Sequence, residues 1–170
     1  AGAWGSYDSY HQANVVGTQN VLDACRAHGI GKLVYTSTPS VTHRATQPEI
    51  GGNEKTAPAA DGFKAWYPST KRVAEEAVLA ANGPALATVA LRPRLIWGPG
   101  DNQLLPRLVQ RAYAGRLRFV GDGQNRWPGV HRLDAARLYR LAIEQGATNG
   151  PYHAVADEGV PLKTIAELIG

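Results

Sequence analysis

The stretch KLVYTS, residues Lys32 to Ser37, is typical of a short buried strand. Before it, from about Tyr10 to His28, apolar and small side chains recur at helical spacing, and Gly29 follows as a C-cap. After it, a helix is predicted from Tyr67 to Ala81 and a second strand from Ala87 to Leu91. Strands that alternate with helices in this way predict an α/β fold with a parallel sheet.

The remaining elements follow the same alternation. We expect helices at Leu104 to Ala114, Leu133 to Gln145 and Pro161 to Ile169, and short strands at Leu117 to Val120 and Tyr152 to Ala156. The segment from Pro39 to Phe63 is rich in Pro, Gly and Thr and is longer than a plain connection requires. This loop is therefore a candidate for function.

Composition and charge argue against several classes of protein. None of the 170 residues falls in an apolar stretch long enough for a membrane span, and no signal peptide pattern is present, so we expect no membrane partner and a cytoplasmic location. A single cysteine, Cys25, predicts neither an internal disulfide nor a metal site. Between Arg92 and Arg140 lie ten Arg and three Asp, a patch suited to phosphates or to solvent. Nucleic acid is not expected, because these arginines lack interleaved aromatic residues.

Two groups of residues carry the candidate chemistry. Tyr67 and Lys71 are four residues apart on a predicted helix, so they share a face and the ammonium can lie near the phenol oxygen. A nearby cation lowers the pKa of a tyrosine, as a general acid or base requires. The run Tyr35 to Val41 places several hydroxyls at the carboxyl end of the first strand, where open α/β sheets bind ligands.

Four motifs in this order resemble the extended short-chain dehydrogenase/reductases, the NAD-dependent epimerase/dehydratase family. They are Asn14-Val15-Val16-Gly17-Thr18, the hydroxyl run, Tyr67 to Lys71, and Leu91-Arg92-Pro93 through Trp97-Gly98-Pro99-Gly100-Asp101. The Tyr-Thr-Ser run and the Leu-Arg-Pro segment look closest to the 3β-hydroxysteroid dehydrogenase-like branch. The resemblance, which extends from Asn14 to about Ile169, implies the C-terminal part of a Rossmann-like parallel sheet with a small substrate-binding subdomain. Residues 1–100 would form the partial Rossmann-like catalytic portion and residues 101–170 mostly the substrate-binding portion, with the strand near 152–156 returning to the sheet.

The resemblance also implies an activity: an NAD- or NADP-dependent oxidoreductase that acts on a secondary alcohol or ketone by hydride transfer. In such an enzyme Tyr67 is the catalytic acid/base, and Lys71 holds the nicotinamide ribose while it lowers the pKa of the tyrosine. Thr38 matches the residue that hydrogen-bonds the substrate oxygen. Ser37 is the alternative candidate for this role, because within the run Thr36-Ser37-Thr38 the family position can also be matched one residue earlier.

Further residues match less specific positions of the family. Asn14 matches an asparagine of the site's water and backbone network, with a structural helix-kink residue as the alternative. Pro93 and the residues after it resemble the segment whose backbone lies along the nicotinamide. Apolar Leu95 suits the rim of a site for a hydrophobic substrate, or core packing below it. Arg126 resembles the arginine that touches a diphosphate in sugar-nucleotide members.

One departure concerns the cofactor. The glycine-rich turn that seats the pyrophosphate in this family does not occur in the chain, and neither does any methionine. We therefore expect a fragment that lacks the N-terminal glycine-rich half, inactive alone, with a homodimer left open for the complete protein. Two alternatives to the small-molecule oxidoreductase stay open: a sugar-nucleotide epimerase or dehydratase, and a non-catalytic relative that senses a cofactor or binds a partner.

Overall fold

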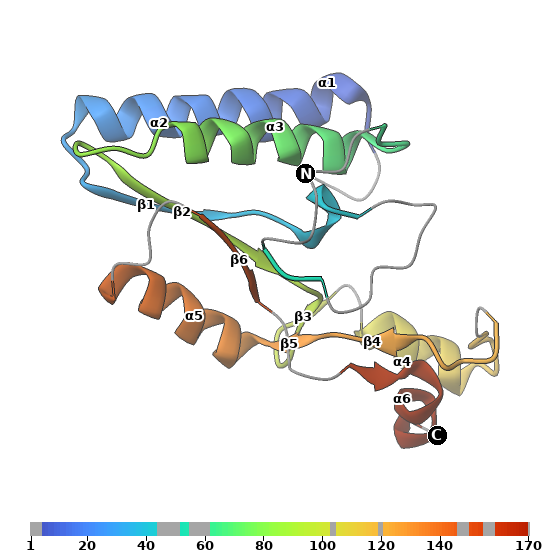
Figure 1. Cartoon of the computed structure of the whole chain (residues 1–170). Helices are drawn as coiled ribbons and strands as arrows, with labels where there is room; N and C mark the ends of the chain where they lie inside the picture. Colours follow the sequence, from blue (N-terminus) through green and yellow to red (C-terminus); the bar gives the residue numbers. More distant parts are fainter. Residues whose placement is uncertain are drawn as a thin grey trace. The chain divides into compact units, whose positions relative to one another are not determined.

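The computed structural model describes residues 5–43, 52–54, 62–102, 105–118, 121–145, 150–154 and 159–169. The chain divides into two compact units (Figure 1). Unit 1 consists of Ala1–Pro93 and Leu138–His153, and unit 2 of Arg94–Arg137 and Ala154–Gly170. None of the helices in the described ranges is long and apolar enough to cross a lipid bilayer.

Unit 1 is built on a three-stranded sheet with the order β1-β2-β6. Its strands are β1 (Lys32–Thr36), β2 (Ala87–Pro93) and β6 (Pro151–Ala154). β1 and β2 are parallel, with Lys32 opposite Ala87 and Thr36 opposite Leu91. The parallel α/β sheet predicted from the alternation of elements is therefore confirmed.

Helices cover both faces of this sheet (Figure 1). On one face lie α1 (Tyr7–Tyr10), the π-helical segment η1 (His11–Val16), α2 (Gly17–Ala27) and α3 (Trp66–Ala80), and on the other lies α5 (Arg132–Glu144). Leu33 and Tyr35 of β1 pack on the α2 and α3 side, whereas Val34 packs against the cluster that contains Ala142 of α5. The alternation along β1 follows the two-residue period of a strand, so both faces contribute to the core.

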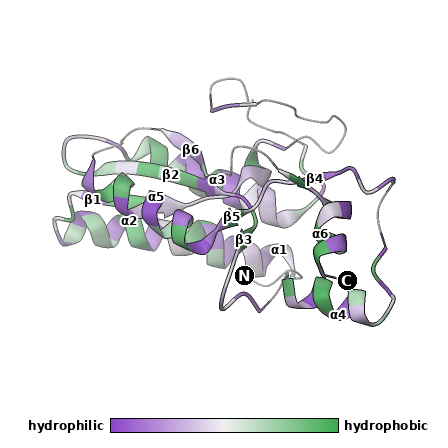
Figure 2. Ribbon diagram, turned by 90° about the horizontal axis from the view of Figure 1, so that it is seen from below, coloured by the Kyte–Doolittle hydropathy of each residue, from purple (hydrophilic) through white to green (hydrophobic). Residues whose placement is uncertain are grey.

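β2 is the most deeply buried strand. Thr88 to Arg92 are all buried, and Figure 2 shows the hydrophobic colouring of this strand. A strand that is covered by helices on both faces is expected to be buried along its length. The backbone pairing of β1 and β2 continues past β1, because the Ser37 amide donates to the Leu91 carbonyl at 2.7 Å.

The expected helix from Tyr10 to His28 is present, but it is not regular. Six of its residues, His11–Val16, form a π-helix, in which the Gly17 amide donates to the Gln12 carbonyl. Gly29 has φ 63° and ends the helix as predicted, with the Ile30 amide donating to the Cys25 carbonyl at 2.9 Å. Cys25 itself is buried as a free thiol.

In its described residues, unit 2 contains two short helices, the start of α5 (residues 132–137) and pairs of two-residue strands. The helices are α4 (Leu105–Tyr113) and α6 (Leu162–Ile169); β3 (Ile96–Trp97) pairs in parallel with β5 (Val130–His131), and β4 (Arg126–Trp127) pairs antiparallel with β7 (Val160–Pro161). These strands were not expected, because two residues give no periodic pattern. The strand expected at Leu117 to Val120 is wrong for residues 117–118, and residues 119–120 lie outside the described part of the chain. Most of the candidate loop, residues 44–51 and 55–61, also lies outside it.

Candidate active site

The helix α3 carries Tyr67 and Lys71 with the predicted spacing. The Lys71 ammonium donates to the Thr36 carbonyl at 2.6 Å and lies 4.2 Å from the centre of the Tyr35 ring. It is therefore held at the carboxyl end of β1. Burial lowers the pKa of Lys71 to about 8, and the Glu75 carboxylate acts in the opposite direction. Tyr67 keeps 37% of its surface exposed.

Thr38 and Ser37 follow directly after β1 and are both buried. Thr38 is the N-cap of the short 3-10 helix η2 (Pro39–Val41), and its hydroxyl oxygen accepts from the Ser40 amide at 3.3 Å. The Ser37 hydroxyl has no hydrogen-bond partner in the described part of the chain. Because η2 packs against α3, the structure brings both hydroxyl residues to the helix of Tyr67 and Lys71.

Asn14 lies in the π-helical segment and contacts α3. Its side-chain amide donates to the Thr70 hydroxyl at 2.9 Å, and the Thr70 hydroxyl in turn bonds the Trp66 carbonyl at 2.8 Å. Thr70 stands between Tyr67 and Lys71 in sequence and is 2% exposed. Asn14 thus links the irregular helix to the backbone of the helix that carries the candidate dyad.

The other predicted residues lie at the end of unit 1 or in unit 2. Pro93 is the last residue of β2. Leu95 is 46% exposed, so core packing does not describe its side chain. The Arg126 guanidinium donates to the Gly159 carbonyl at 3.0 Å within unit 2. Asn14, Ser37, Thr38, Tyr67 and Lys71 all belong to unit 1, whereas Leu95 and Arg126 belong to unit 2.

Comparison with known proteins identifies the family. Residues 3–130 match the 3-beta hydroxysteroid dehydrogenase/isomerase family. The chain belongs to this family. The resemblance predicted from the four motifs is confirmed, including its branch.

Curated relatives of this family member share substantial sequence identity. A 2-alkyl-3-oxoalkanoate reductase from Stenotrophomonas maltophilia (strain K279a) is 65% identical over 144 residues, which are 85% of this chain and 44% of the relative. Another from Shewanella oneidensis is 50% identical, covering 84% of this chain and 38% of the relative. A sterol-4-alpha-carboxylate 3-dehydrogenase from Saccharomyces cerevisiae is 38% identical, covering 81% and 40%. The chain thus spans less than half the length of these relatives.

Solved structures of other enzymes have the same fold as this member of the 3-beta hydroxysteroid dehydrogenase/isomerase family. WbmG from Bordetella bronchiseptica, solved with NAD, has a TM-score of 0.80 at 21% identity and covers 99% of this chain and 53% of that one. A dTDP-glucose 4,6-dehydratase from Bacillus anthracis, also solved with NAD, has a TM-score of 0.77 at 23% identity, with 98% and 54% covered. At these identities the likeness concerns the fold, which is Rossmann-like as expected.

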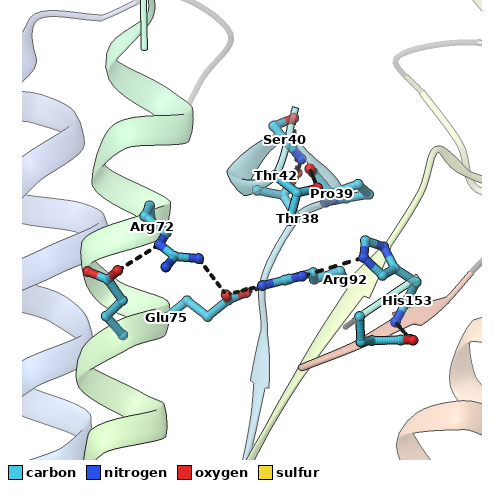
Figure 3. Close-up of polar contacts among 10 residues, drawn as sticks. Thr38, Pro39, Ser40, Thr42, Arg72, Glu75, Arg92 and His153 are labelled. Atoms are coloured by element: carbon cyan, nitrogen blue, oxygen red, sulfur yellow. Dashed lines mark hydrogen bonds and ion pairs between the residues drawn. The ribbon is translucent and has the colours of Figure 1, made fainter. Parts of the chain in front are cut away.

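Two interactions in the unit that contains Tyr67 and Lys71 were not predicted from the sequence. Glu75, which lies one helical turn after Lys71, forms a buried ion pair with Arg92 (Figure 3). The Tyr139 hydroxyl, from α5, donates to the Thr36 hydroxyl at 2.8 Å, and Thr36 is also the residue whose carbonyl holds Lys71. In the sequence, Glu75 lies one helical turn after Lys71 and Arg92 directly follows the predicted strand Ala87 to Leu91, but neither position predicts that the two side chains pair. No local pattern points to Tyr139.

Proposed function

We propose that the chain carries the catalytic part of an NAD- or NADP-dependent oxidoreductase that interconverts a secondary alcohol and a ketone. The observation that carries this proposal is the grouping of a partly exposed Tyr67, a Lys71 ammonium held at the end of β1, and the buried hydroxyls of Ser37 and Thr38. An acid, a cation that tunes it and a hydrogen-bond donor are what a carbonyl reduction requires from the protein.

Tyr67 acts as the general acid in the direction of reduction. Its phenol donates a proton to the carbonyl oxygen of the substrate, and the phenolate that remains is stabilised by the Lys71 ammonium. The Thr38 hydroxyl donates a hydrogen bond to the same substrate oxygen, with Ser37 as the alternative donor. A nicotinamide cofactor, when bound, would supply the hydride that the carbonyl carbon takes up as the ketone becomes a secondary alcohol. In the reverse direction Tyr67 is the base.

The residues present fit the nicotinamide end of the cofactor. Lys71 uses one of its three donors for the Thr36 carbonyl, which leaves donors for ribose hydroxyls, and Pro93 ends the neighbouring strand. The glycine-rich turn for the pyrophosphate is not part of this sequence. Relatives solved with NAD support this class of cofactor.

A hydrophobic substrate is favoured by two observations. The names of the relatives include an alkyl-oxoalkanoate reductase, a farnesyl-dihydroquinoline-oxide ketoreductase and a sterol dehydrogenase, each acting on a compound with a large apolar group. Unit 2 contains a cavity of about 320 Å³, which is in the range of small-molecule sites. Its lining is almost entirely apolar and includes Trp97, Leu105, Trp127, Val160 and Ile165. We therefore propose that the substrate is a ketone with a long hydrocarbon group.

The test uses the complete protein that contains this chain. Nicotinamide absorbance is followed with a 2-alkyl-3-oxoalkanoate in the presence of NADH or NADPH. Separately, the products formed from dTDP-glucose and UDP-glucose are followed in the presence of oxidised NAD or NADP. Oxidation of the cofactor by the oxoalkanoate, lost in Tyr67→Phe, is the expected result. Conversion of a sugar nucleotide without net reduction of the cofactor would instead establish the epimerase or dehydratase alternative. Absence of both reactions would favour the non-catalytic alternative.

A further inference from the structure

Glu75 is a buried carboxylate that the proposed reaction does not use. It lies on α3, one helical turn after Lys71, and its side chain is 0% exposed. A buried carboxylate is strongly unfavourable unless other groups satisfy its charge and its hydrogen-bonding capacity. Its position one helical turn from Lys71, a candidate catalytic residue, therefore requires a physical explanation.

Arg92 provides the counter-charge from β2 (Figure 3). Its Nε donates to Glu75 Oε2 at 2.9 Å and its Nη2 donates to Glu75 Oε1 at 2.5 Å, so the guanidinium binds both carboxylate oxygens. Arg92 is 3% exposed. Arg72 contributes a weaker contact, with Nη1 at 3.9 Å from Glu75 Oε1, and is itself bound to Glu76 at 2.7 Å. The Glu75 carboxylate is thus held in one orientation.

Arg92 is fixed in turn from a third element. Its Nη1 lies 3.4 Å from Nε2 of His153 on β6, and the His153 amide donates to the Glu54 carboxylate at 2.7 Å (Figure 3). A guanidinium only donates hydrogen bonds, so His153 Nε2 is the acceptor. The Glu75 to Arg92 ion pair and its contact with His153 therefore connect α3 with β2 and β6.

We propose that Glu75 is a positioning residue for Lys71: Arg92 fixes the carboxylate one helical turn from Lys71, and this fixed negative charge favours the charged ammonium that donates to the Thr36 carbonyl. This inference rests on the role proposed above for Lys71. A charged ammonium is needed both to stabilise the Tyr67 phenolate and to bind a ribose hydroxyl.

The surroundings of Lys71 explain why a carboxylate is needed. From β1 it faces the Tyr35 ring and the Thr36 carbonyl, and from α3 its own neighbours are Tyr67 and Glu75. Tyr139 of α5 donates to the Thr36 hydroxyl. The other charged or titratable groups contact Glu75 directly or through one another, and they are Arg72, Arg92, Glu54, Glu76 and His153. Burial disfavours the ammonium and lowers its pKa, and the opposing charge effect comes from Glu75. Loss of the Glu75 charge should therefore lower the pKa of Lys71 further.

The direct test measures the titration of Lys71 in the complete protein by NMR of isotope-labelled lysine side chains. In Glu75→Gln, which keeps the shape but not the charge, the Lys71 transition should move to lower pH by about one unit. The pH profile of kcat/KM should shift with it, and Glu75→Asp should restore much of the wild-type behaviour. Glu144→Gln is the control, because Glu144 is an exposed carboxylate of α5 that pairs with Arg140 outside the Glu75 network, and it should leave Lys71 unchanged.

Glu75→Gln leaves Arg92 without its counter-charge, so a second variant protects the test against misfolding. E75Q/R92M removes both buried charges and should also lower the Lys71 transition, by a smaller amount. A wild-type Lys71 titration in whichever of the two variants folds would overturn the proposal. The NMR readout does not require turnover, so a shifted Lys71 in a protein without reductase activity would refute the proposed reaction and leave the positioning effect intact.

Discussion

Tyr67, Lys71 and Thr38 have different tasks in the proposed reaction, so substitutions should separate them. In the complete enzyme, Tyr67→Phe should abolish turnover and leave cofactor affinity nearly unchanged, because only the proton donor is lost. Lys71→Ala should reduce both, since the ammonium also binds the ribose. Thr38→Ala should cost about 2.7–4 kcal/mol of transition-state stabilisation, as for one lost hydrogen-bond donor. Steady-state kinetics and cofactor titration measure these effects.

A control for these variants is available on the same helix. The Ser69 hydroxyl is exposed and donates to the Trp66 carbonyl, so Ser69→Ala should leave kcat almost unchanged. If Tyr67→Phe retains more than a few per cent of kcat, the assignment of Tyr67 as the acid is wrong.

The titration of Lys71 predicts how stability depends on pH. Burial lowers its pKa from 10.5 to about 8 in the folded protein. Between about pH 8 and 10.5 the unfolded chain therefore binds more protons than the folded one, and the free energy of unfolding rises with pH. The free energy of unfolding of wild type, measured with urea, should therefore increase relative to that of Lys71→Met as the pH rises through this window.

Tyr35 acts with the opposite sign at higher pH. Burial raises its pKa from 10.0 to about 12, so above pH 10 its ionisation favours the unfolded state. Wild type and Lys71→Met both retain Tyr35, so its effect largely cancels in their difference. A stability difference that is flat from pH 8 to 10.5 would contradict the environment described for Lys71.

The end of helix α2 shows how a single residue type determines an element boundary. Gly29 has φ 63°, a conformation that costs an L-residue with a Cβ about 1–2 kcal/mol. Gly29→Ala should therefore lower the free energy of unfolding by about this amount. Gly31→Ala is the matched control: a Cβ at either position meets no atom within 4 Å, but only Gly29 has a positive φ. Denaturant unfolding should separate the two variants, and equal losses would show that backbone strain is not the cause.

At the scale of the whole molecule, the sheet of unit 1 has an open edge. In the described part of the chain, β1 is hydrogen-bonded to β2 on one side only. Its residues Leu33, Val34 and Tyr35 are apolar, and Lys32 is the charged residue beside them. Unpaired edges of this kind promote association between chains.

We therefore expect the isolated 170-residue chain to self-associate or to lose a fixed fold. Size-exclusion chromatography with light scattering, together with a thermal melt, tests this expectation. The complete protein, measured in parallel, is the control. A monodisperse species of 18.2 kDa with one cooperative transition would show that the edge of β1 is protected in solution.

Local sequence was sufficient for the features that depend on short-range patterns. The strand at Lys32, the helix that carries Tyr67 and Lys71, the strand at Ala87 and the helix end at Gly29 were all predicted within a few residues. Each depends on periodicity or on a backbone requirement that a few neighbouring residues express. The family could be predicted for the same reason, because its motifs are contiguous.

Tertiary structure was needed wherever the partners are distant in sequence. Arg126 pairs with Pro161 across two-residue strands, Tyr139 reaches Thr36 from another helix, and Lys71 finds the Thr36 carbonyl. The Glu75 to Arg92 ion pair is the clearest case, since each residue alone resembles an ordinary surface charge. Their burial follows from the packing of α3 on β2, and that long-range contact has no local signature in the amino-acid sequence.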